Sequence, residues 1–294
     1  MSPSAVIEPF IEVTPLTALE FDQIRKLAYE RFGLDLRHGK EQLVSARLTK
    51  KIRELKFHSF REYYRHVMED TSGAALVAMI DALTTNHTSF FREPAHFDFL
   101  KAAVLLELRD RERINIWCAA SSTGEEAYSI AFTALDAFDF SILPKLRIIA
   151  TDISTRVLAT AEAGTYPAEK FDGFHPEQMR RYLLRGTGEW QDWYRIKKEI
   201  RGAIEFRRLN LNQPFSFAAP FPIIFCRNVM IYFDRPTRQT LVNRLFDCLE
   251  PGGYLFTGYS ETLSGMDQRL TYVRPAIYCK GKPGAMRGRV GKKG

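Results

Sequence analysis

The stretch from Ile114 to Ile130 constrains the fold of this chain more than any other. Its sequence, INIWCAASSTGEEAYSI, begins as a short apolar strand, passes through small residues and enters a helix near Thr123. A strand, a turn of small residues and a helix together form the geometry of a nucleotide site, because small side chains let the backbone approach the ligand. The stretch therefore predicts an α/β fold with a ligand site at the turn. The alternative is an ordinary strand-to-helix junction whose first helical turn is acidic.

The residues of this turn favour a cationic ligand over a polyphosphate. Ala119, Ala120 and Ser121 stand where a dinucleotide site prefers glycine, and no lysine follows them. The carboxylates of Glu125 and Glu126 at the helix start would repel a phosphate, whereas they suit positive groups. S-adenosylmethionine fits this pattern, since it carries a sulfonium and an ammonium group and no phosphate.

The length and the apolar content of the chain favour two domains in an aqueous compartment. A chain of 294 residues is long enough for two domains, and a hydrophobic content of 45% is sufficient for a hydrophobic core. No apolar run approaches the length of a membrane span, and the N-terminus lacks a signal pattern, so we expect a cytoplasmic protein without membrane insertion. The four cysteines have neither metal-binding nor redox spacing, which predicts reduced core thiols and no metal site.

The net charge of +7 is concentrated and does not indicate a nucleic-acid partner. Residues 280–294 hold six Lys or Arg and no acid, which leaves about one positive charge for the rest of the chain. We expect residues 281–294, which are also rich in Gly, to form a disordered basic tail. A second basic cluster lies between residues 37 and 65, where nine Lys or Arg face three Glu.

Residues 16–84 have the pattern of an all-helical domain that follows a flexible N-terminus, residues 1–15. Thr17 and Glu20 have the spacing of a capping box, and apolar residues at helical spacing indicate four helices. The second helix carries a basic group made of Arg47, Lys50, Lys51 and Arg53. Such a face is usually a solvated helix surface, and the alternative is a docking surface for an acidic partner.

Polar residues follow four predicted strands at the point where each one ends. They are Glu126 after the first strand, Asp152 after the second, Asn210 with Leu211 after the third, and Arg227 with Asn228 after the fourth. The carboxyl ends of parallel strands meet at one edge of a sheet, and an acid after the second strand is where such folds bind ribose hydroxyls. Residues 164–202 interrupt the strand–helix rhythm and predict a small inserted subdomain with a hairpin.

Three blocks of the chain resemble the bacterial chemotaxis receptor methyltransferases of the CheR type. The blocks are TNHTSFFR at residues 85–92, the stretch from Trp117 to Ile130, and CRNVMIYF at residues 226–233. The resemblance runs from about Leu16 to Lys280 and departs at Tyr259, where many relatives have His. It implies a Rossmann-like, S-adenosylmethionine-dependent methyltransferase domain over residues 85–280 with an inserted antiparallel β-subdomain over residues 164–202. An all-α N-terminal domain over residues 16–84 precedes it.

The resemblance also implies an activity. It is methyl transfer from S-adenosylmethionine to glutamate side chains of chemoreceptor cytoplasmic helices, which leaves methyl esters and S-adenosylhomocysteine. The implied cofactor-binding residues are Asn86, Thr88, Arg92, Glu126, Asp152, Asn210, Leu211, Arg227 and Asn228. Arg92 and Tyr232 are implied on the methyl-acceptor side. Because a glutamate is already ionised at pH 7, the reaction needs alignment and no general base.

Two further contacts with the receptor are expected. The protein itself is expected to act as a monomer. The basic helix with Arg47, Lys50, Lys51 and Arg53 is expected to dock on the acidic receptor helices. Gly186 and Gly188 mark a loop that resembles the one in family members that hold a C-terminal receptor pentapeptide by strand addition. We expect at least two of the nearby aromatic residues Trp190, Trp193 and Tyr194 to pack the subdomain.

Two other classes of function stay open on the sequence. A methyltransferase acting on nucleic acid or a small molecule is disfavoured, because the basicity lies mostly in the tail and no Asn-Pro-Pro-Tyr base pocket is present. A non-catalytic cofactor-binding regulator would be expected to lack Arg92 or Tyr232, and both are present.

Overall fold

The computed structural model describes residues 11–85 and 87–286, and the chain divides into two compact units, Met1–Asn86 and His87–Gly294. The division falls two residues after the predicted boundary between residues 84 and 85. Within the described ranges, no helix is both long enough and apolar enough to cross a membrane.

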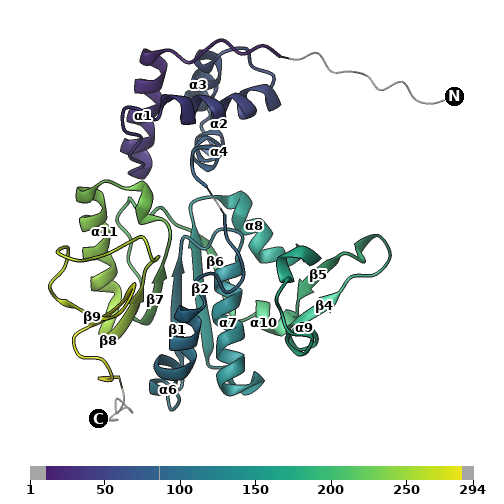
Figure 1. The fold of residues 1–294 in the computed structure, drawn as a ribbon, viewed down its shortest axis with the longest axis vertical. Coiled ribbons are helices and arrows are strands. Elements are labelled where there is room, and N and C mark those ends of the chain that lie inside the picture. Colours follow the sequence, from purple (N-terminus) through teal and green to yellow (C-terminus); the bar gives the residue numbers. More distant parts are fainter. Residues whose placement is uncertain (1–10, 86, 287–294) are drawn as a thin grey trace. The chain divides into compact units, whose positions relative to one another are not determined.

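The first unit consists of four helices, α1 (Ala18–Phe32), α2 (Glu41–Glu54), α3 (Phe60–Glu69) and α4 (Ala74–Leu83) (Figure 1). The predicted capping box starts α1: the Thr17 hydroxyl accepts from the Glu20 amide, and the Glu20 carboxylate accepts from the Thr17 amide at 2.9 Å. Gly33 ends the helix with a φ of 71°, which favours glycine. Apolar residues at helical spacing fill the core of this unit, among them Ile24, Val44, Leu48, Ile52, Tyr63 and Met79.

The start of the described chain lies against these helices. The Thr14 amide donates to the His58 carbonyl at 3.0 Å, and Arg53 Nε donates to the Ile11 carbonyl at 3.2 Å. The predicted flexibility of residues 1–15 is therefore wrong for residues 11–15, because the basic helix supplies a partner for their backbone. Residues 1–10 lie outside the described residues.

The second unit is built on a seven-stranded sheet in the order β6-β2-β1-β7-β8-β10-β9 (Figure 1). All neighbouring strands are parallel except at β10, which runs against both β8 and β9. The strands are β1 (Ile114–Ala119), β2 (Leu146–Asp152), β6 (Ile204–Arg208), β7 (Phe221–Cys226), β8 (Leu249–Phe256), β9 (Leu270–Arg274) and β10 (Ile277–Lys280). The strand β7 is buried along its whole length, as expected for the centre of a sheet covered on both faces.

Helices cover both faces of this sheet. Alternate residues of β1 point to opposite sides, so that Ile116 joins a core with α7 (Glu125–Phe138), whereas Trp117 joins a core with α11 (Arg235–Cys248). A helical segment before β1 packs in the α7 core and is made of α5 (Ala95–Phe99), the π-helical turn η1 (Leu100–Val104) and α6 (Leu105–Glu107). The helix α8 (Thr155–Ala163) follows β2.

The predicted insertion forms a separate three-stranded antiparallel sheet in the order β3-β5-β4 (Figure 1). Its elements are β3 (Thr165–Pro167), the turn η3 (Ala168–Phe171), α9 (Pro176–Tyr182), β4 (Leu183–Arg185), β5 (Trp193–Ile196) and α10 (Lys198–Arg201). The predicted α/β fold with an inserted antiparallel subdomain and a preceding all-helical domain is confirmed. The expectation that two nearby aromatics pack the insertion is wrong: Tyr194 packs on Phe171, but Trp190 and Trp193 are 52% and 37% exposed.

The described part of the basic tail is ordered against the sheet. The Gly284 amide donates to the Tyr254 hydroxyl at 3.2 Å, and the Met286 side chain is buried in the core on the α7 side. The predicted disorder of residues 281–294 is therefore wrong for residues 281–286, because an apolar side chain anchors them. Residues 287–294 lie outside the described residues.

Candidate active site

The candidate site lies where the strand order reverses, between β1 and β7. In the sheet register, Ala119 at the end of β1 pairs with Thr151 in β2 and with Cys226 at the end of β7. The segments that leave these three strands therefore emerge side by side at the carboxyl edge. This is the position at which open α/β sheets hold their ligands.

The segments at this edge carry most of the unusual backbone in the chain. Eight non-glycine residues among those described have a positive φ. Three of them, Ala120, Ser122 and Asn228, lie in the segments that leave β1 and β7, and two more, Phe91 and Glu93, lie in the segment that Arg227 joins to them. Each such conformation costs free energy and persists only where the surroundings enforce it, so the clustering is typical of a functional site.

Asp152, at the tip of β2, ties two segments together. One carboxylate oxygen accepts from the Ser122 amide at 2.9 Å, and the other accepts from the Ser154 amide at 3.0 Å. The carboxylate is therefore oriented by backbone groups of the β1 turn and of its own loop. The structure thus places this acid beside the turn of small residues.

The two carboxylates at the start of α7 have different environments. The Glu125 side chain has no exposed surface and accepts from Lys170 Nζ at 2.9 Å, so the expectation that it faces a cationic ligand is wrong. Its position on the inner side of the helix puts it against the insertion, which supplies the cation. Glu126 is 14% exposed at its side chain and accepts from Arg227 Nη1 at 2.8 Å. Burial raises the pKa of Glu126, and the Arg227 charge opposes this rise.

Arg227 is the centre of the polar network and not part of its surface. Its side chain is fully buried and donates to Glu126, to Glu93 Oε2 at 2.9 Å and to the Arg92 carbonyl at 2.5 Å. Burial favours the neutral form of Glu93, but the charge and hydrogen bonds of Arg227 outweigh it and hold the pKa of Glu93 below its usual range. The guanidinium thereby joins the segment of residues 87–93 to the start of α7.

Sequence reasoning missed Glu93, which accepts from two further segments. Its Oε1 accepts from Asn228 Nδ2 and from the Tyr259 amide, both at 3.3 Å. The run Arg-Glu-Pro at residues 92–94 has the pattern of an ordinary helix start, so no local signal separates this acid from a simple capping residue. Asn228 and Tyr259 lie 135 and 166 residues further along the chain than Glu93.

The remaining predicted site residues lie on the same edge segments. Arg92 Nη1 donates to the His87 carbonyl at 2.7 Å, and the Thr88 carbonyl accepts from Lys170 at 3.3 Å. Asn210 Oδ1 accepts from the Asn212 amide at 2.9 Å, and Leu211 is buried. Tyr232 ends the short helix η5 (Met230–Tyr232), which begins two residues after Asn228. Asn86 lies outside the described residues.

The proposed docking helix α2 uses part of its positive charge internally. Arg47 donates to the carbonyl of Leu83, which ends α4, and its Nη2 donates to Thr85 Oγ1 at 2.7 Å. Lys51 pairs with Glu54 at 3.2 Å, whereas the Lys50 side chain is exposed. Of the four predicted docking residues, Arg47 and Arg53 therefore have structural roles within their own unit, since Arg53 also donates to the Ile11 carbonyl.

The predicted peptide loop is tight at Gly186. A Cβ atom at this position would lie 2.0 Å from the Trp190 carbonyl oxygen, and the Gly186 amide donates to the Trp193 carbonyl at 2.8 Å. Gly188 has a φ of 61°, and a Cβ atom there would meet nothing within 4 Å. The two glycines therefore serve different purposes: Gly186 permits close approach and Gly188 permits the turn.

Comparison with protein families agrees with this architecture. Residues 86–279 match the family described as "CheR methyltransferase, SAM binding domain", and residues 19–84 match the one described as "CheR methyltransferase, all-alpha domain". Together the two matches cover nearly all the described chain.

Curated proteins from several bacteria are similar over almost their full length. The chain is 40% identical to the chemotaxis protein methyltransferase 2 of Pseudomonas aeruginosa, over 89% of this chain and 93% of that protein. It is 42% identical to the chemotaxis protein methyltransferase of Klebsiella aerogenes, over 90% of each. It is 37% identical to that of Escherichia coli K12, over 91% of this chain and 92% of that protein.

Proposed function

Because this chain belongs to the CheR methyltransferase family, whose activity is S-adenosylmethionine-dependent methylation in chemotaxis, we propose that its acceptors are glutamate side chains of chemoreceptors. The product would be a glutamate methyl ester. The family assigns the methyl donor and the process, and the proposal adds the chemical group that is methylated.

The pairing of the carboxylates around the site carries this proposal. Asp152, Glu93 and Glu126 each accept hydrogen bonds from protein donors, and the pair formed by Glu93 and Glu126 is held by one buried arginine, Arg227. Burial and the nearby Arg227 charge lower the pKa of His96 to about 4, so this fully buried ring is a weak proton acceptor. These groups are poorly placed to deprotonate an amine or a hydroxyl. An acceptor that is already ionised, such as glutamate, needs no such step.

The residues at the carboxyl edge fit the methyl donor. Asp152 offers a charged acceptor for ribose hydroxyls, Glu126 offers negative charge, and the small residues of the β1 turn leave room for the ligand. When bound, S-adenosylmethionine supplies an activated methyl group on a sulfonium. We assign Asn86, Thr88, Arg92, Asn210, Leu211 and Asn228 to the same binding surface, and Arg227 to holding Glu126 and Glu93 in place.

The protein's task in the reaction is alignment. Arg92 offers a cation to the incoming carboxylate, and Tyr232 offers a hydroxyl on the adjoining segment. Holding the reacting atoms in line can lower a barrier by roughly 7–11 kcal/mol, which is enough for an acceptor that is already a nucleophile. No covalent intermediate with the protein is required.

Transfer of radiolabelled methyl to receptor fragments tests the proposal. Label that alkali releases as methanol identifies an ester, whereas label that resists alkali identifies methylated nitrogen and contradicts the glutamate acceptor. A receptor fragment whose exposed glutamates are replaced by alanine is the matched control, and it should take up no label.

We also propose that the inserted sheet holds a C-terminal receptor pentapeptide. The strand order leaves β4 at an edge, Leu184 in this strand is 53% exposed, and Trp190 and Trp193 are exposed and contact each other. Strand addition at such an edge draws affinity from backbone hydrogen bonds and specificity from side-chain pockets. The tether would raise the local concentration of the enzyme, which we propose acts as a cytoplasmic monomer, near its receptors.

A titration with pentapeptides that end in aromatic and acidic residues tests the tether. Gly186→Ala, or deletion of residues 186–188, should weaken binding, because the turn can no longer close on Trp190. Gly202→Ala lies in the same insertion, where a Cβ atom has ordinary contacts, and should bind like the unaltered protein. No binding to the unaltered protein, or equal binding by all variants, would rule the tether out.

A further inference from the structure

Glu261, in the segment after β8, is a buried acid that none of the roles above uses. It is 2% exposed, and no lysine or arginine of the described chain forms an ion pair with it. An unpaired carboxylate is costly to bury unless several donors satisfy it. Three backbone amides do so here, from Asn228 at 2.8 Å, Gly258 at 2.7 Å and Ile231 at 3.2 Å.

Two of these three amides belong to the segment that carries Asn228 and Tyr232. Asn228 adopts a φ of 57°, a left-handed conformation that is uncommon for non-glycine residues and that Asn tolerates better than most. Its amide donates to Glu261, and its side chain donates to Glu93. The two carboxylates thus hold Asn228 from its backbone and from its side chain, and the Ile231 amide fixes the start of the turn that ends at Tyr232.

Gly258 allows the segments after β7 and β8 to touch. A Cβ atom at this position would lie 2.5 Å from Asn228 Nδ2 and 2.9 Å from Glu261 Oε2. Both distances are shorter than real Cβ contacts, so any side chain here would push the two segments apart. The close approach that brings Glu261 onto the Asn228 amide therefore depends on glycine.

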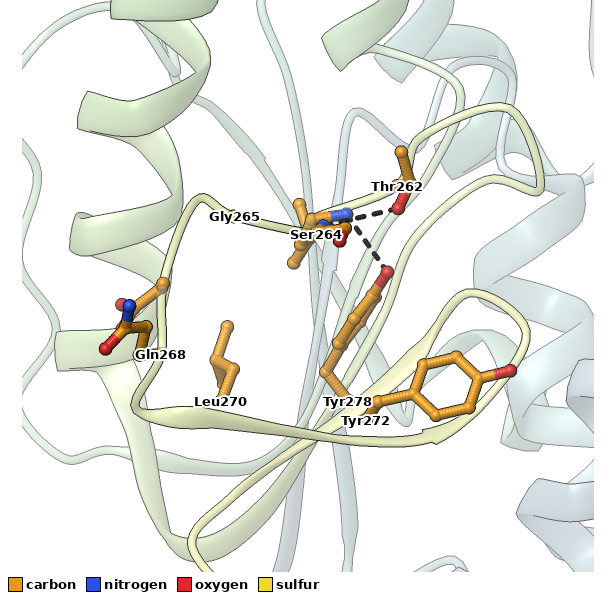
Figure 2. A pocket seen from close by; sticks show the side chains of 9 residues that line it. Thr262, Ser264, Gly265, Gln268, Leu270, Tyr272 and Tyr278 are labelled. Atoms are coloured by element: carbon orange, nitrogen blue, oxygen red, sulfur yellow. Dashed lines mark hydrogen bonds between the residues drawn. The ribbon is translucent and has the colours of Figure 1, made fainter.

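The chain beyond Glu261 is held by packing and by a hydrogen bond, and it borders an open pocket (Figure 2). The Leu263 amide donates to the Tyr278 hydroxyl at 3.0 Å, and the Leu263 and Leu270 side chains are buried in the core on the α11 side. The pocket has a volume of about 400 Å³, and Thr262, Gly265 and Tyr272 are among the residues that line it. The carboxylate itself, together with the Thr257 hydroxyl that donates to the Glu261 carbonyl at 3.0 Å, supplies the order at Glu261.

We propose that Glu261 is a positioning residue for methyl transfer, whose ionised carboxylate holds the Asn228–Tyr232 segment in its working conformation. The inference rests on the proposed function for the roles of Asn228 and Tyr232. Burial raises the pKa of Glu261, and the backbone hydrogen bonds oppose this rise. The observation that favours the charged form is geometric: the two carboxylate oxygens together accept from three backbone amides.

Glu261→Gln tests the proposal with little change of shape. One of the two oxygens becomes the NH2 group of a side-chain amide, which faces a backbone N–H, so a donor meets a donor. We expect the Kd for S-adenosylhomocysteine to rise about tenfold and kcat to fall by about the same factor or more, with the KM for the receptor fragment unchanged. Gly258→Ala disturbs the same contact from the other side and should give the same pattern.

Glu250→Gln is the matched control. Glu250 lies in β8 and pairs with Arg111 at 2.8 Å, so its loss costs stability without touching the Asn228 segment. A purely structural role would reduce the folded fraction and leave the Kd of that fraction unchanged. An unchanged Kd and a kcat within about twofold in both Glu261→Gln and Gly258→Ala would overturn the proposal. The Kd measurement needs no acceptor, so it is independent of whether glutamate is the methylated group.

Discussion

At the scale of single residues, Asp152 combines two observed backbone contacts with the ligand contact that we propose for it. Its two oxygens accept amides from two segments, and this geometry orients the charge at the sheet edge. A charged acceptor strengthens a hydrogen bond beyond what a neutral amide gives. Replacing Asp152 by Asn removes the charge and keeps the shape of the side chain, so it tests the contribution of the charge alone.

We predict that Asp152→Asn raises the Kd for S-adenosylmethionine about tenfold, because a charge-assisted bond is worth on the order of 1.5–3 kcal/mol. Calorimetry measures the change. Asp139→Asn is the control, since Asp139 also accepts a backbone amide, at 2.7 Å, but lies after the far end of α7. Equal affinity in the Asp152 variant and the unaltered protein would remove this residue from the binding site.

We predict that Tyr232→Phe leaves the Kd for the methyl donor within about twofold and lowers kcat roughly tenfold, because the hydroxyl acts in the reacting complex more than in the ground state. Steady-state kinetics with calorimetry separates the two quantities. Tyr272→Phe removes a hydroxyl from a residue that is 61% exposed and should change neither. A loss confined to cofactor affinity would contradict the role given to Tyr232.

The sequence predicted residues that end strands and could not predict the acids that join segments. Asp152 and Asn228 follow buried strands, so their place at the sheet edge could be read from apolar runs and turns. Glu93 and Glu261 lie in segments without periodicity, and both bind Asn228, which is 135 residues after Glu93 and 33 residues before Glu261. Only the folded chain reveals those contacts, because pairing across segments leaves no local pattern.

At the scale of secondary-structure elements, α2 combines a structural and a proposed binding face. Arg47 donates to the end of α4, so the charge at this position stabilises its own unit. The sequence analysis placed all four basic residues of α2 in one group, because helical spacing cannot show which of them form hydrogen bonds within their own unit. Lys50 and Lys51 remain the better test of receptor docking.

We predict that Lys50→Glu with Lys51→Glu raises the KM for receptor roughly tenfold at low salt and leaves the cofactor Kd unchanged, since opposite fields steer the encounter. The difference should shrink as salt screens the charges. The same change of charge on α1, Arg25→Glu with Lys26→Glu, is the control. If the α2 and α1 variants had the same KM at low salt, the docking face would have to lie elsewhere.

At the scale of the whole methyltransferase unit, the insertion is joined to the start of α7. Lys170 of η3 donates to the buried Glu125 and to the Thr88 carbonyl, and the Tyr166 hydroxyl of β3 donates to the Thr123 carbonyl at 2.6 Å. The apolar pattern of the sequence predicted the insertion and its hairpin. It did not predict these joints, since Lys170 and Glu125 lie 45 residues apart on different elements.

We predict that Lys170→Met lowers the free energy of unfolding, because it leaves Glu125 buried without a cation. Breaking a buried ion pair costs roughly 3–5 kcal/mol, and we expect a value near the lower end because Lys170 itself is partly hydrated. Urea unfolding measures the loss. Glu125→Gln combined with Lys170→Met should recover part of it. Lys197→Met, which removes a lysine that donates to the Arg180 carbonyl in the same insertion, should change stability by less than about 0.5 kcal/mol.

The joint between Lys170 and Glu125 limits how this enzyme could be recombined with its relatives. A chimaera that exchanges residues 164–202 takes the cation from one parent and keeps the buried acid of the other. If the grafted segment lacks a lysine equivalent to Lys170, the graft leaves Glu125 buried without its cation at the start of α7. The insertion therefore cannot be exchanged as an independent module. A working chimaera needs Lys170 and Glu125 to come from the same parent, or a lysine equivalent to Lys170 in the graft.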